Sequence, residues 1–371
     1  MPISTVIATV GSSILRNLER KLGSEFDVKT AVHSLKKLSD PINERMFGAE
    51  INSIASLIDE AYIDSAQNLY FIVSDTDDGE KAGEILKGFF EDNPFGLEFN
   101  KVEVVKINDL NDKNPEAFKK QGLRNLVKTL ARIYKDHNGN ILINATGGYK
   151  AQIAIASVFG QAFKVPVYYR FEAFNKIIQL LPIPMKVDTT VLKRYLKLFV
   201  ILDCRSQISK EEFFKITGFH SIGAVDNDLK VLIDWDKRDV WMNHLGQIYF
   251  EHYDLTYEEV ERIIRSGEAP EKKLILGDDP TFRKVASKIM NMLNAVASLP
   301  PISKVYSKAA GKKGTSKRVS INLAEGDAMN MMIGTDKGNI SVRLLLAQKC
   351  SSDKVKEVIK VKIEEVVNNF L

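Results

Sequence analysis

The sequence predicts an α/β protein in which a doubly wound parallel sheet precedes a mainly helical region and a small α+β region. Short apolar runs such as 69–73 alternate with amphipathic helices through the first half, as in a parallel sheet covered on both faces. The 371 residues suggest two or three domains at ~150 residues each. With 44% hydrophobic and 27% charged residues the chain can build a core, which excludes wholesale disorder. Every apolar run is shorter than the ~18 residues of a membrane span.

The elements of the first half follow from this alternation of apolar and amphipathic segments. Polar and small residues punctuate it, as in the loop from Ser74 to Gly79. The connector Leu181-Pro182-Ile183-Pro184 is stiff because proline fixes φ, and it closes a first domain of residues 1–187. The expected order is strand 4–10, helix 12–22, helix 43–62, strand 69–73, helix 79–90, strand 101–107, helix 115–136, strand 140–144, helix 149–163 and a hairpin of 165–171 and 176–180.

Residues 188–268 change in character and predict a winged helix-turn-helix, because three helices followed by a β-ribbon are typical of that motif. The expected elements are helices 191–203, 209–217 and 221–233, strands 239–243 and 247–252, and a further helix 256–266. The third helix carries Asp226, Asp228 and Asp234, which make a poor surface for phosphates. A spacer, dimerisation or protein-docking role is therefore favoured over DNA binding.

Residues 269–371 predict a small α+β domain with strong positive charge. They hold 18 basic and 10 acidic side chains, whereas the rest of the chain holds 34 and 38. No acidic residue lies between Pro280 and Ala324, so this region is expected to meet a polyanion. The expected elements are strand 272–276, helix 279–298, extended segments 303–307, 317–324, 328–334 and 339–347, and a lysine-rich helix 352–369.

The cysteine and histidine content limits the chemistry and the compartment. Two cysteines, Cys204 and Cys350, exclude a disulfide framework and a cysteine-rich zinc site, and they fit a reducing cytoplasm. The N-terminus lacks the basic start of a signal peptide and reads as a strand, which agrees with a cytoplasmic protein that has no membrane association. We expect no bound metal.

Two glycine-rich loops stand out, and each follows a predicted parallel strand. The first is Gly11-Ser12-Ser13, and the second is Asn144-Ala145-Thr146-Gly147-Gly148-Tyr149-Lys150. Small residues at such places let backbone N–H groups face an anion, with help from the helix N-terminus. Ligands of open α/β sheets bind at the carboxyl ends of the strands. Neither loop is a Walker motif or a dinucleotide fingerprint, and a plain turn is the alternative reading of each.

These two loops resemble those of the CARF domain, the CRISPR-associated Rossmann-like sensor of cyclic oligoadenylates. The tail from Tyr168-Tyr169-Arg170-Phe171-Glu172 to the proline connector is similar as well, so the resemblance covers about half of the chain. It implies a homodimer whose loops form one composite pocket for a ring-shaped RNA messenger across the dyad. Some members also cleave the ring, a role for which Ser12, Ser13 and Lys150 would be tested. The binding candidates carried over by match are Gly11, Ser12, Ser13, Asn144, Thr146, Gly147, Gly148, Tyr149 and Lys150.

Two common effector chemistries are disfavoured in the second half. A HEPN ribonuclease needs an arginine a few residues before a histidine, and the two matches, at Arg132 and Arg238, are of a kind that arises by chance. No histidine follows His252, so the C-terminal region cannot hold that motif. A restriction-type nuclease needs clustered carboxylates to hold Mg²⁺, which the acid-free stretch lacks.

The C-terminal region resembles instead the RelE toxin fold, in its element order, size and charge. RelE-type RNA cleavage proceeds by 2′-hydroxyl attack, which cations and orientation can drive without a metal. A tyrosine or histidine near the C-terminus, usual in that family, is absent here after Tyr306. Gly311-Lys312-Lys313-Gly314 is expected to contact RNA or the ribosome rather than to catalyse. The catalytic candidates are Lys304, Tyr306, Lys308, Lys317, Arg318, Arg343 and Lys349.

The whole arrangement resembles the CARF–RelE mRNA interferases, with domains 1–187, 188–268 and 269–371. The resemblance implies a CRISPR type III ancillary effector of antiviral defence. Cyclic oligoadenylate, most commonly tetra-adenylate, would bind the homodimer and allosterically activate a ribosome-dependent endoribonuclease that cuts mRNA without a metal or cofactor. The alternative is a CARF–winged-helix transcription regulator that binds DNA.

Overall fold

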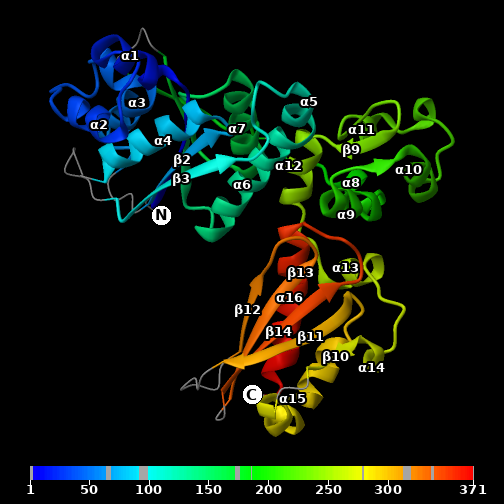
Figure 1. Ribbon diagram of the computed structural model, residues 1–371. Coiled ribbons are helices and arrows are strands. Elements are labelled where there is room, and N and C mark those ends of the chain that lie inside the picture. The colour runs from blue at the N-terminus through cyan, green and yellow to red at the C-terminus, as the bar shows by residue number, and fades with distance from the viewer. Residues whose placement is uncertain are drawn as a thin grey trace. The chain divides into compact units, whose positions relative to one another are not determined.

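The computed structural model divides the chain into two compact units (Figure 1). The first unit is Met1–Thr189 with Asn243–His252, and the second is Thr190–Met242 with Tyr253–Leu371. The structure describes residues 3–63, 68–91, 99–171, 176–184, 186–277, 280–311, 319–335 and 338–370, with the backbone alone at 280–288, 308–311, 335 and 338. The division into three domains stays a prediction.

The first unit is built on a six-stranded sheet, and its expected parallel character is confirmed. The strands are β1 (Thr5–Thr9), β2 (Asn68–Ser74), β3 (Lys101–Ile107), β4 (Ile141–Asn144), β5 (Val167–Arg170) and β6 (Ile177–Leu180). Their order is β3-β2-β1-β4-β5-β6, parallel throughout except for β6, which pairs antiparallel with β5. The chain moves outward from β1 to β3 and then returns to place β4 on the other side of β1. The gap between β1 and β4 is therefore the topological switch point at which such sheets bind ligands.

Helices cover both faces of this sheet, because side chains of a strand alternate between its faces. Val6 and Ala8 of β1 pack with one group of helices, whereas Ile7 between them packs with the other. The first group is α1 (Ser13–Leu22), α2 (Val28–Lys36), α3 (Gly48–Asp59) and α4 (Asp77–Phe90). The second group is α6 (Leu123–Asp136), α7 (Lys150–Phe163) and α12 (His244–His252). Shorter helices of this unit are η1 (Arg45–Phe47), α5 (Pro115–Ala117) and the π-helical η2 (Phe118–Gly122).

Helix α12 corrects the prediction that 247–252 is a strand of a β-ribbon. Ile248 is buried in the core of the first unit, and the polar residues Gln247 and Glu251 lie one turn apart on the helix. The buried Arg124 donates through Nε to Gln247 Oε1 at 3.1 Å, and Lys135 pairs with Glu251 at 2.8 Å. This spacing of four suits a helix, since residues four apart share one helical face.

The N-terminal part of the second unit has a small three-stranded antiparallel sheet of order β7-β9-β8. Its strands are β7 (Ile208–Ser209), β8 (Ile233–Trp235) and β9 (Asp239–Met242). The helices around it are α8 (Thr190–Arg194), α9 (Leu196–Arg205), α10 (Lys210–Thr217), η3 (Ile222–Ala224), α11 (Asn227–Lys230) and α13 (Tyr257–Ile263). Whether this part is a winged helix stays a prediction.

The expected long helix 221–233 is wrong, because this segment forms η3, α11 and the start of β8 instead. Val225 adopts an extended backbone conformation between the two short helices. The next residue, Asp226, accepts hydrogen bonds from Tyr195 and from Arg194, the latter at 3.1 Å. A carboxylate held in this way favours a cap or turn over a helix interior.

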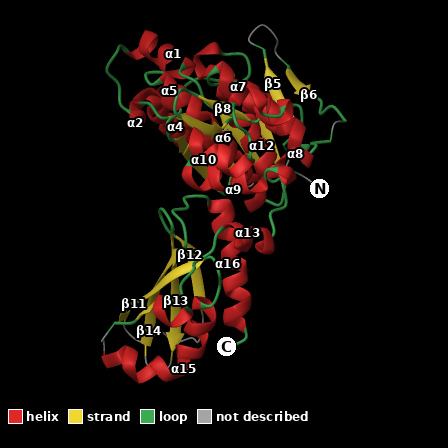
Figure 2. Cartoon of the chain, turned by 90° about the vertical axis from the view of Figure 1, so that its right-hand side faces the viewer, coloured by secondary structure: helices red, strands yellow, loops and turns green. Residues whose placement is uncertain are grey.

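The C-terminal part of the second unit is a five-stranded sheet with helices packed against it (Figure 2). Its order is β10-β11-β14-β13-β12, antiparallel except for the pairing of β10 with β11. The strands are β10 (Leu274–Ile275), β11 (Ile302–Gly311), β12 (Val319–Leu323), β13 (Ala328–Thr335) and β14 (Gly338–Leu346). The helices are α14 (Pro270–Lys273), α15 (Pro280–Ala297) and α16 (Asp353–Asn368). The expected order of elements is found here, whereas its assignment to the RelE fold stays a prediction.

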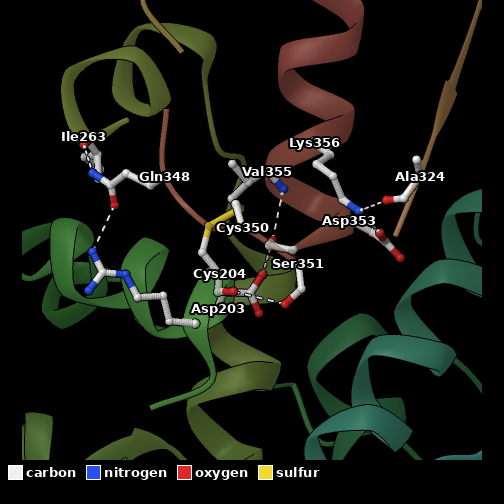
Figure 3. The surroundings of a disulfide bond; sticks show 12 residues. Asp203, Cys204, Ile263, Ala324, Gln348, Cys350, Ser351, Asp353, Val355 and Lys356 are labelled. Atoms are coloured by element: carbon white, nitrogen blue, oxygen red, sulfur yellow. Dashed lines mark hydrogen bonds and ion pairs between the residues drawn. A yellow bond between two sulfur atoms is a disulfide. The ribbon is translucent and has the colours of Figure 1, made fainter. Parts of the chain in front are cut away.

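The two cysteines are bonded to each other in a single disulfide, which the sequence did not predict, whereas a reducing cytoplasm stays a prediction. Cys204 at the end of α9 and Cys350 before α16 have Cα atoms 4.1 Å apart (Figure 3). Ser351 donates to the carbonyl oxygen of Cys204 through both its N–H and its hydroxyl, at 3.1 and 3.0 Å. The Ser352 hydroxyl, which caps α16, donates to the buried carboxylate of Asp203. The two cysteines are 146 positions apart in the sequence, so no local pattern indicates that they are close in space.

Among the described residues, no helix combines the length and the apolar character needed to cross a membrane.

Candidate functional site

The two glycine-rich loops meet at the carboxyl edge of the first sheet and line a cavity of about 490 Å³, here called the glycine cavity. It is completed by the loop after β2 and by Asp112 and Lys113, which follow β3. The predicted residues that line it are Gly11, Ser12, Ser13, Thr146, Gly147, Gly148 and Tyr149. Lys150, the first residue of α7, is exposed and does not line this cavity, and Asn144 lies buried beneath the second loop.

Close backbone contact explains why both loops need glycine. A Cβ atom on Gly147 would stand 2.0 Å from Glu50 Oε1, and one on Gly11 would stand 2.9 Å from the backbone nitrogen of Gly148. Gly148 itself has φ +101°, a conformation that side chains disfavour. The Thr9 hydroxyl donates to the carbonyl oxygen of Gly147 and ties the second loop to β1.

Glu50 lies directly behind the two loops and was not predicted from the sequence. Its side chain projects from the first turn of α3 and is 1% exposed. Oε1 accepts a hydrogen bond from the Gly11 N–H at 2.7 Å, whereas Oε2 has no partner among the described residues. Burial raises the pKa of this carboxyl, so its neutral form is favoured. The sequence offers one weak signal, a run of polar residues in a helix that is otherwise apolar.

Asn144 fixes the second loop and does not face the cavity. It is 1% exposed, its Nδ2 donates to Ser53 Oγ at 2.7 Å, and its Oδ1 accepts from the Thr146 hydroxyl at 2.6 Å. Thr146 Oγ1 in turn accepts from the backbone N–H of Arg170 at 3.1 Å. Among the predicted binding residues, Asn144 is thus a positioning residue that sets the orientation of Thr146.

Tyr149 caps α7 and lines the glycine cavity with its ring. Gln152 Oε1 accepts from the Tyr149 N–H at 3.3 Å, and Gln152 Nε2 donates to the carbonyl oxygen of Ile72 at 3.0 Å. Burial raises the pKa of the Tyr149 phenol, and the nearby charge of Asp112 raises it further. The phenol therefore stays protonated at neutral pH and can donate a hydrogen bond.

A second cavity of about 450 Å³ adjoins the first, and we call it the arginine cavity. Ser13, Arg16, Ala49 and Thr146 line both cavities. The arginine cavity has no carboxylate among its lining residues, whereas the glycine cavity has four acidic residues: Glu50, Asp77, Asp78 and Asp112. The four arginines that line the arginine cavity are Arg16, Arg20, Arg45 and Arg170. The sequence prediction missed these arginines, although Arg16 and Arg20 lie one helical turn apart directly after the first loop.

The C-terminal candidates are only partly brought together. Lys304 and Tyr306 alternate with the buried Val305 on β11, and Tyr306 pairs with the exposed Arg343 on β14. Lys304, Tyr306 and Arg343 therefore share the face of the sheet opposite the core. Lys304 Nζ forms an ion pair with Glu268 at 2.7 Å, and this carboxylate partly neutralises the charge of the lysine.

The remaining candidates lie elsewhere or outside the description. Lys349 is on the loop after β14, where it lines a cavity of about 710 Å³ with Arg205, Asp327 and the disulfide. The side chain of Lys308 and the whole of Lys317 and Arg318 lie outside the described residues. In the part of the chain that the structure describes, no group of three or more histidine, cysteine or acidic residues is arranged to hold a metal ion.

Comparison with known proteins gives one family match. Residues 45–184 match the model of a family described as "CRISPR-associated protein (Cas_APE2256)". This segment runs from η1 to the end of the first unit's sheet and includes Glu50, Arg170 and the second glycine-rich loop. No curated protein matches the chain.

Among solved structures, the protein VC1899 from Vibrio cholerae aligns with 93% of this chain and 78% of its own, at 8% identity and a TM-score of 0.29. Can2 from Sulfobacillus thermosulfidooxidans, solved in complex with cyclic tetra-adenylate, aligns with 100% of this chain and 85% of its own, at 10% identity and a TM-score of 0.27.

Proposed function

We propose that the first unit senses a cyclic oligoadenylate and that the second unit is a ribonuclease activated by that ligand. The observation that carries the proposal is the meeting of two glycine-rich loops at the switch point of a parallel sheet, where a cavity opens between them. Backbone N–H groups and hydroxyls in such a place bind phosphates. The match of residues 45–184 to a CRISPR-associated family supports a role in that defence system.

The sensor acts as a homodimer in this proposal, so that two copies of the loops enclose one ring. An exposed apolar surface near β6 supports it: Val158, Ile178, Leu181 and Ile183 are 45, 39, 71 and 58% exposed. Gln161 of α7 bonds the backbone of Leu181 and of Ile183, at 3.2 and 2.6 Å, which brings the connector against the helix that carries Val158. A contiguous apolar surface of this kind marks an interaction site.

The ribonuclease reaction uses the exposed face of the C-terminal sheet. The 2′-hydroxyl of the RNA gives its proton to water as its oxygen attacks the adjacent phosphorus, the bond to the 5′-oxygen breaks, and a 2′,3′-cyclic phosphate remains. Water then returns one proton to the side chain that protonates the 5′-oxygen. Arg343 would stabilise the negative charge of the phosphorane, and Tyr306 beside it would give a proton to the leaving 5′-oxygen. Orientation by the ribosome supplies the in-line geometry.

Cleavage of the bound ring by the sensor is a separate reaction of the same type. Ser12 and Ser13 line the glycine cavity, where they could hold a ribose 2′-hydroxyl in line with its phosphate. Lys150 is the first residue of α7, the helix that follows the second glycine-rich loop. Product analysis of the ring after incubation tests this role.

A transcription regulator is the less favoured function. The segment expected to read DNA is interrupted, and its Asp226 is held by Tyr195 and Arg194. A short acidic helix is a poor partner for a phosphate backbone.

A translation extract tests the proposal directly. Cyclic tri-, tetra- or hexa-adenylate is added with the protein, and mRNA integrity is followed by primer extension. We expect cuts that need the protein, one of the rings and ribosomes together, and a Lys150→Ala variant that needs more ligand for the same cleavage. Unchanged mRNA with every ring, together with tight binding to duplex DNA, would overturn the proposal in favour of the regulator.

A further inference from the structure

The arginine cavity collects positive charge from three separate elements. Arg16 and Arg20 come from α1, Arg45 from η1 and Arg170 from the end of β5. None of the four forms a direct ion pair with another described residue. Four cations gathered around one cavity without a carboxylate on its wall repel one another, and a bound anion would relieve that repulsion.

Arg170 is the most constrained of the four. It is 8% exposed, its Nη2 donates to the carbonyl oxygen of Ile42 at 2.8 Å, and its Nε has no hydrogen-bond partner among the residues that the structure describes. A buried donor without a partner costs roughly 1–3 kcal/mol, and more when the group is charged. Arg170 lines the arginine cavity, and a guanidinium matches the geometry of a phosphate, which it can bind with two parallel hydrogen bonds.

The arginine cavity shares lining residues with the glycine cavity. Thr146 lines both cavities, and its hydroxyl oxygen accepts a hydrogen bond from the backbone N–H of Arg170 at 3.1 Å. Ser13 and Arg16 also line both, so a ligand on the loops can extend from one cavity to the other. The glycine cavity is also lined by Asp77, Asp78 and Asp112, which accept hydrogen bonds but repel phosphates. A phosphate bound by the glycine-rich loops is therefore expected at Ser13 and Thr146, the loop residues that also line the arginine cavity.

We infer that the arginine cavity holds phosphate groups of the ligand, with Arg170 as their buried anchor, and that the acidic wall of the glycine cavity accepts hydrogen bonds from ribose hydroxyl or adenine amino groups. The inference rests on the proposed function for the identity of the ligand. It divides the ligand's contacts between two cavities of opposite charge, and it assigns binding roles to arginines that lie outside the glycine-rich loops.

Calorimetric titration of the full chain with cyclic tetra-adenylate tests the assignment. Arg170→Gln should weaken binding about tenfold to a hundredfold, since hydrogen bonds to a charged group are lost. Arg20→Ala, on an exposed side chain that folding does not need, should weaken it severalfold. It should also lower the slope of log affinity against log salt by ~0.7, the value for one phosphate contact with a single strand. Arg132→Ala, an exposed arginine of α6 that lines neither cavity, is the matched control and should bind as the wild type does.

The possible outcomes separate this inference from the proposed function. If the wild type binds the ring, and Arg170→Gln and Arg20→Ala bind it equally well with an unchanged salt slope, the arginine cavity is not a phosphate site. If the wild type binds none of the cyclic oligoadenylates, the proposed function fails, and inorganic triphosphate becomes the probe. Thermal protection of the wild type by triphosphate, lost in both variants and kept in Arg132→Ala, would support the phosphate site. Equal protection of all four proteins, or of none, would overturn it.

Discussion

The two units present their candidate sites in opposite ways. In the first unit the site lies in cavities whose shape depends on backbone contacts, with Gly147 pressed against Glu50 and Asn144 buried beneath the loop. In the second unit Tyr306 and Arg343 lie on the face of the C-terminal sheet opposite the core, where Arg343 is exposed to solvent. A small ligand that must be recognised in full requires enclosure, whereas a polymer held by a large partner requires an accessible surface. We therefore expect the proposed ligand site of the first unit to be sensitive to added side-chain volume, and the proposed nuclease site of the second unit to the loss of charge.

The strongest test of the comparison is Arg343→Ala. Removal of one donor that stabilises transition-state charge should lower mRNA cleavage by about a hundredfold to a thousandfold. The affinity for cyclic tetra-adenylate should not change, because Arg343 belongs to the other unit. Cleavage in a translation extract and calorimetric titration provide the two measurements. Lys237→Ala, an exposed lysine of the second unit, is the control, and equal loss in both variants would remove Arg343 from the active surface.

Reduction of the disulfide should act on the second unit alone. The bond closes a long loop, so breaking it should lower the free energy of unfolding by about 2–4 kcal/mol. Thermal melts with and without a phosphine reductant measure the loss, and the double variant Cys204→Ser with Cys350→Ser should be insensitive to the reductant. Two reactive thiols in the denatured, unreduced protein would contradict the bond.

A methyl group on Gly147 tests the volume sensitivity of the sensor site. Gly147→Ala places a Cβ against Glu50 and the Thr9 carbonyl oxygen, so the loop must move, at a cost of about 1–3 kcal/mol in stability or in ligand affinity. Gly267→Ala is the matched control in the second unit, because its Cβ would meet nothing within 4 Å. Melting temperature and ring affinity are measured for both variants, and two unaffected proteins would show that the loops are not closely packed.

The smallest expected effect concerns the pH dependence of stability. The folded-state pKa of Glu50 is raised above 4.5, so the native protein holds this proton more tightly than the unfolded chain does. The stabilisation that Glu50 gives by binding this proton is therefore complete below pH 4.5, and it is lost as the pH rises through the raised pKa. Glu50→Gln should flatten this fall in urea titrations between pH 4 and 8, whereas Glu84→Gln, at an exposed position of α4, should not. Parallel curves for wild type and Glu50→Gln would contradict a buried, protonated Glu50.

Local patterns predicted the sheet of the first unit because each apolar run is itself the signal of a buried strand. The two glycine-rich loops were found for the same reason, since their small residues are contiguous. Glu50 and Arg170 were missed because they reach the site from elements distant in sequence. Asp226 ended a predicted helix through contacts with Arg194 and Tyr195, which no local propensity contains. Residues 247–252 resemble a strand in sequence because their apolar run, 248–250, is too short to distinguish a strand from a short helix.

Helix α12 has a consequence for how the protein is made and inherited. The chain passes between the two units at 189/190, 242/243 and 252/253, so the first unit is not a contiguous stretch of the gene. During synthesis, residues 1–189 emerge without the helix that packs against α6 and accepts a hydrogen bond from Arg124, and their folding can be completed only after residue 252 has left the ribosome. A transfer of the first unit to another protein by recombination at residue 189 would leave that part of its core open to water. The exchangeable module therefore extends at least through α12.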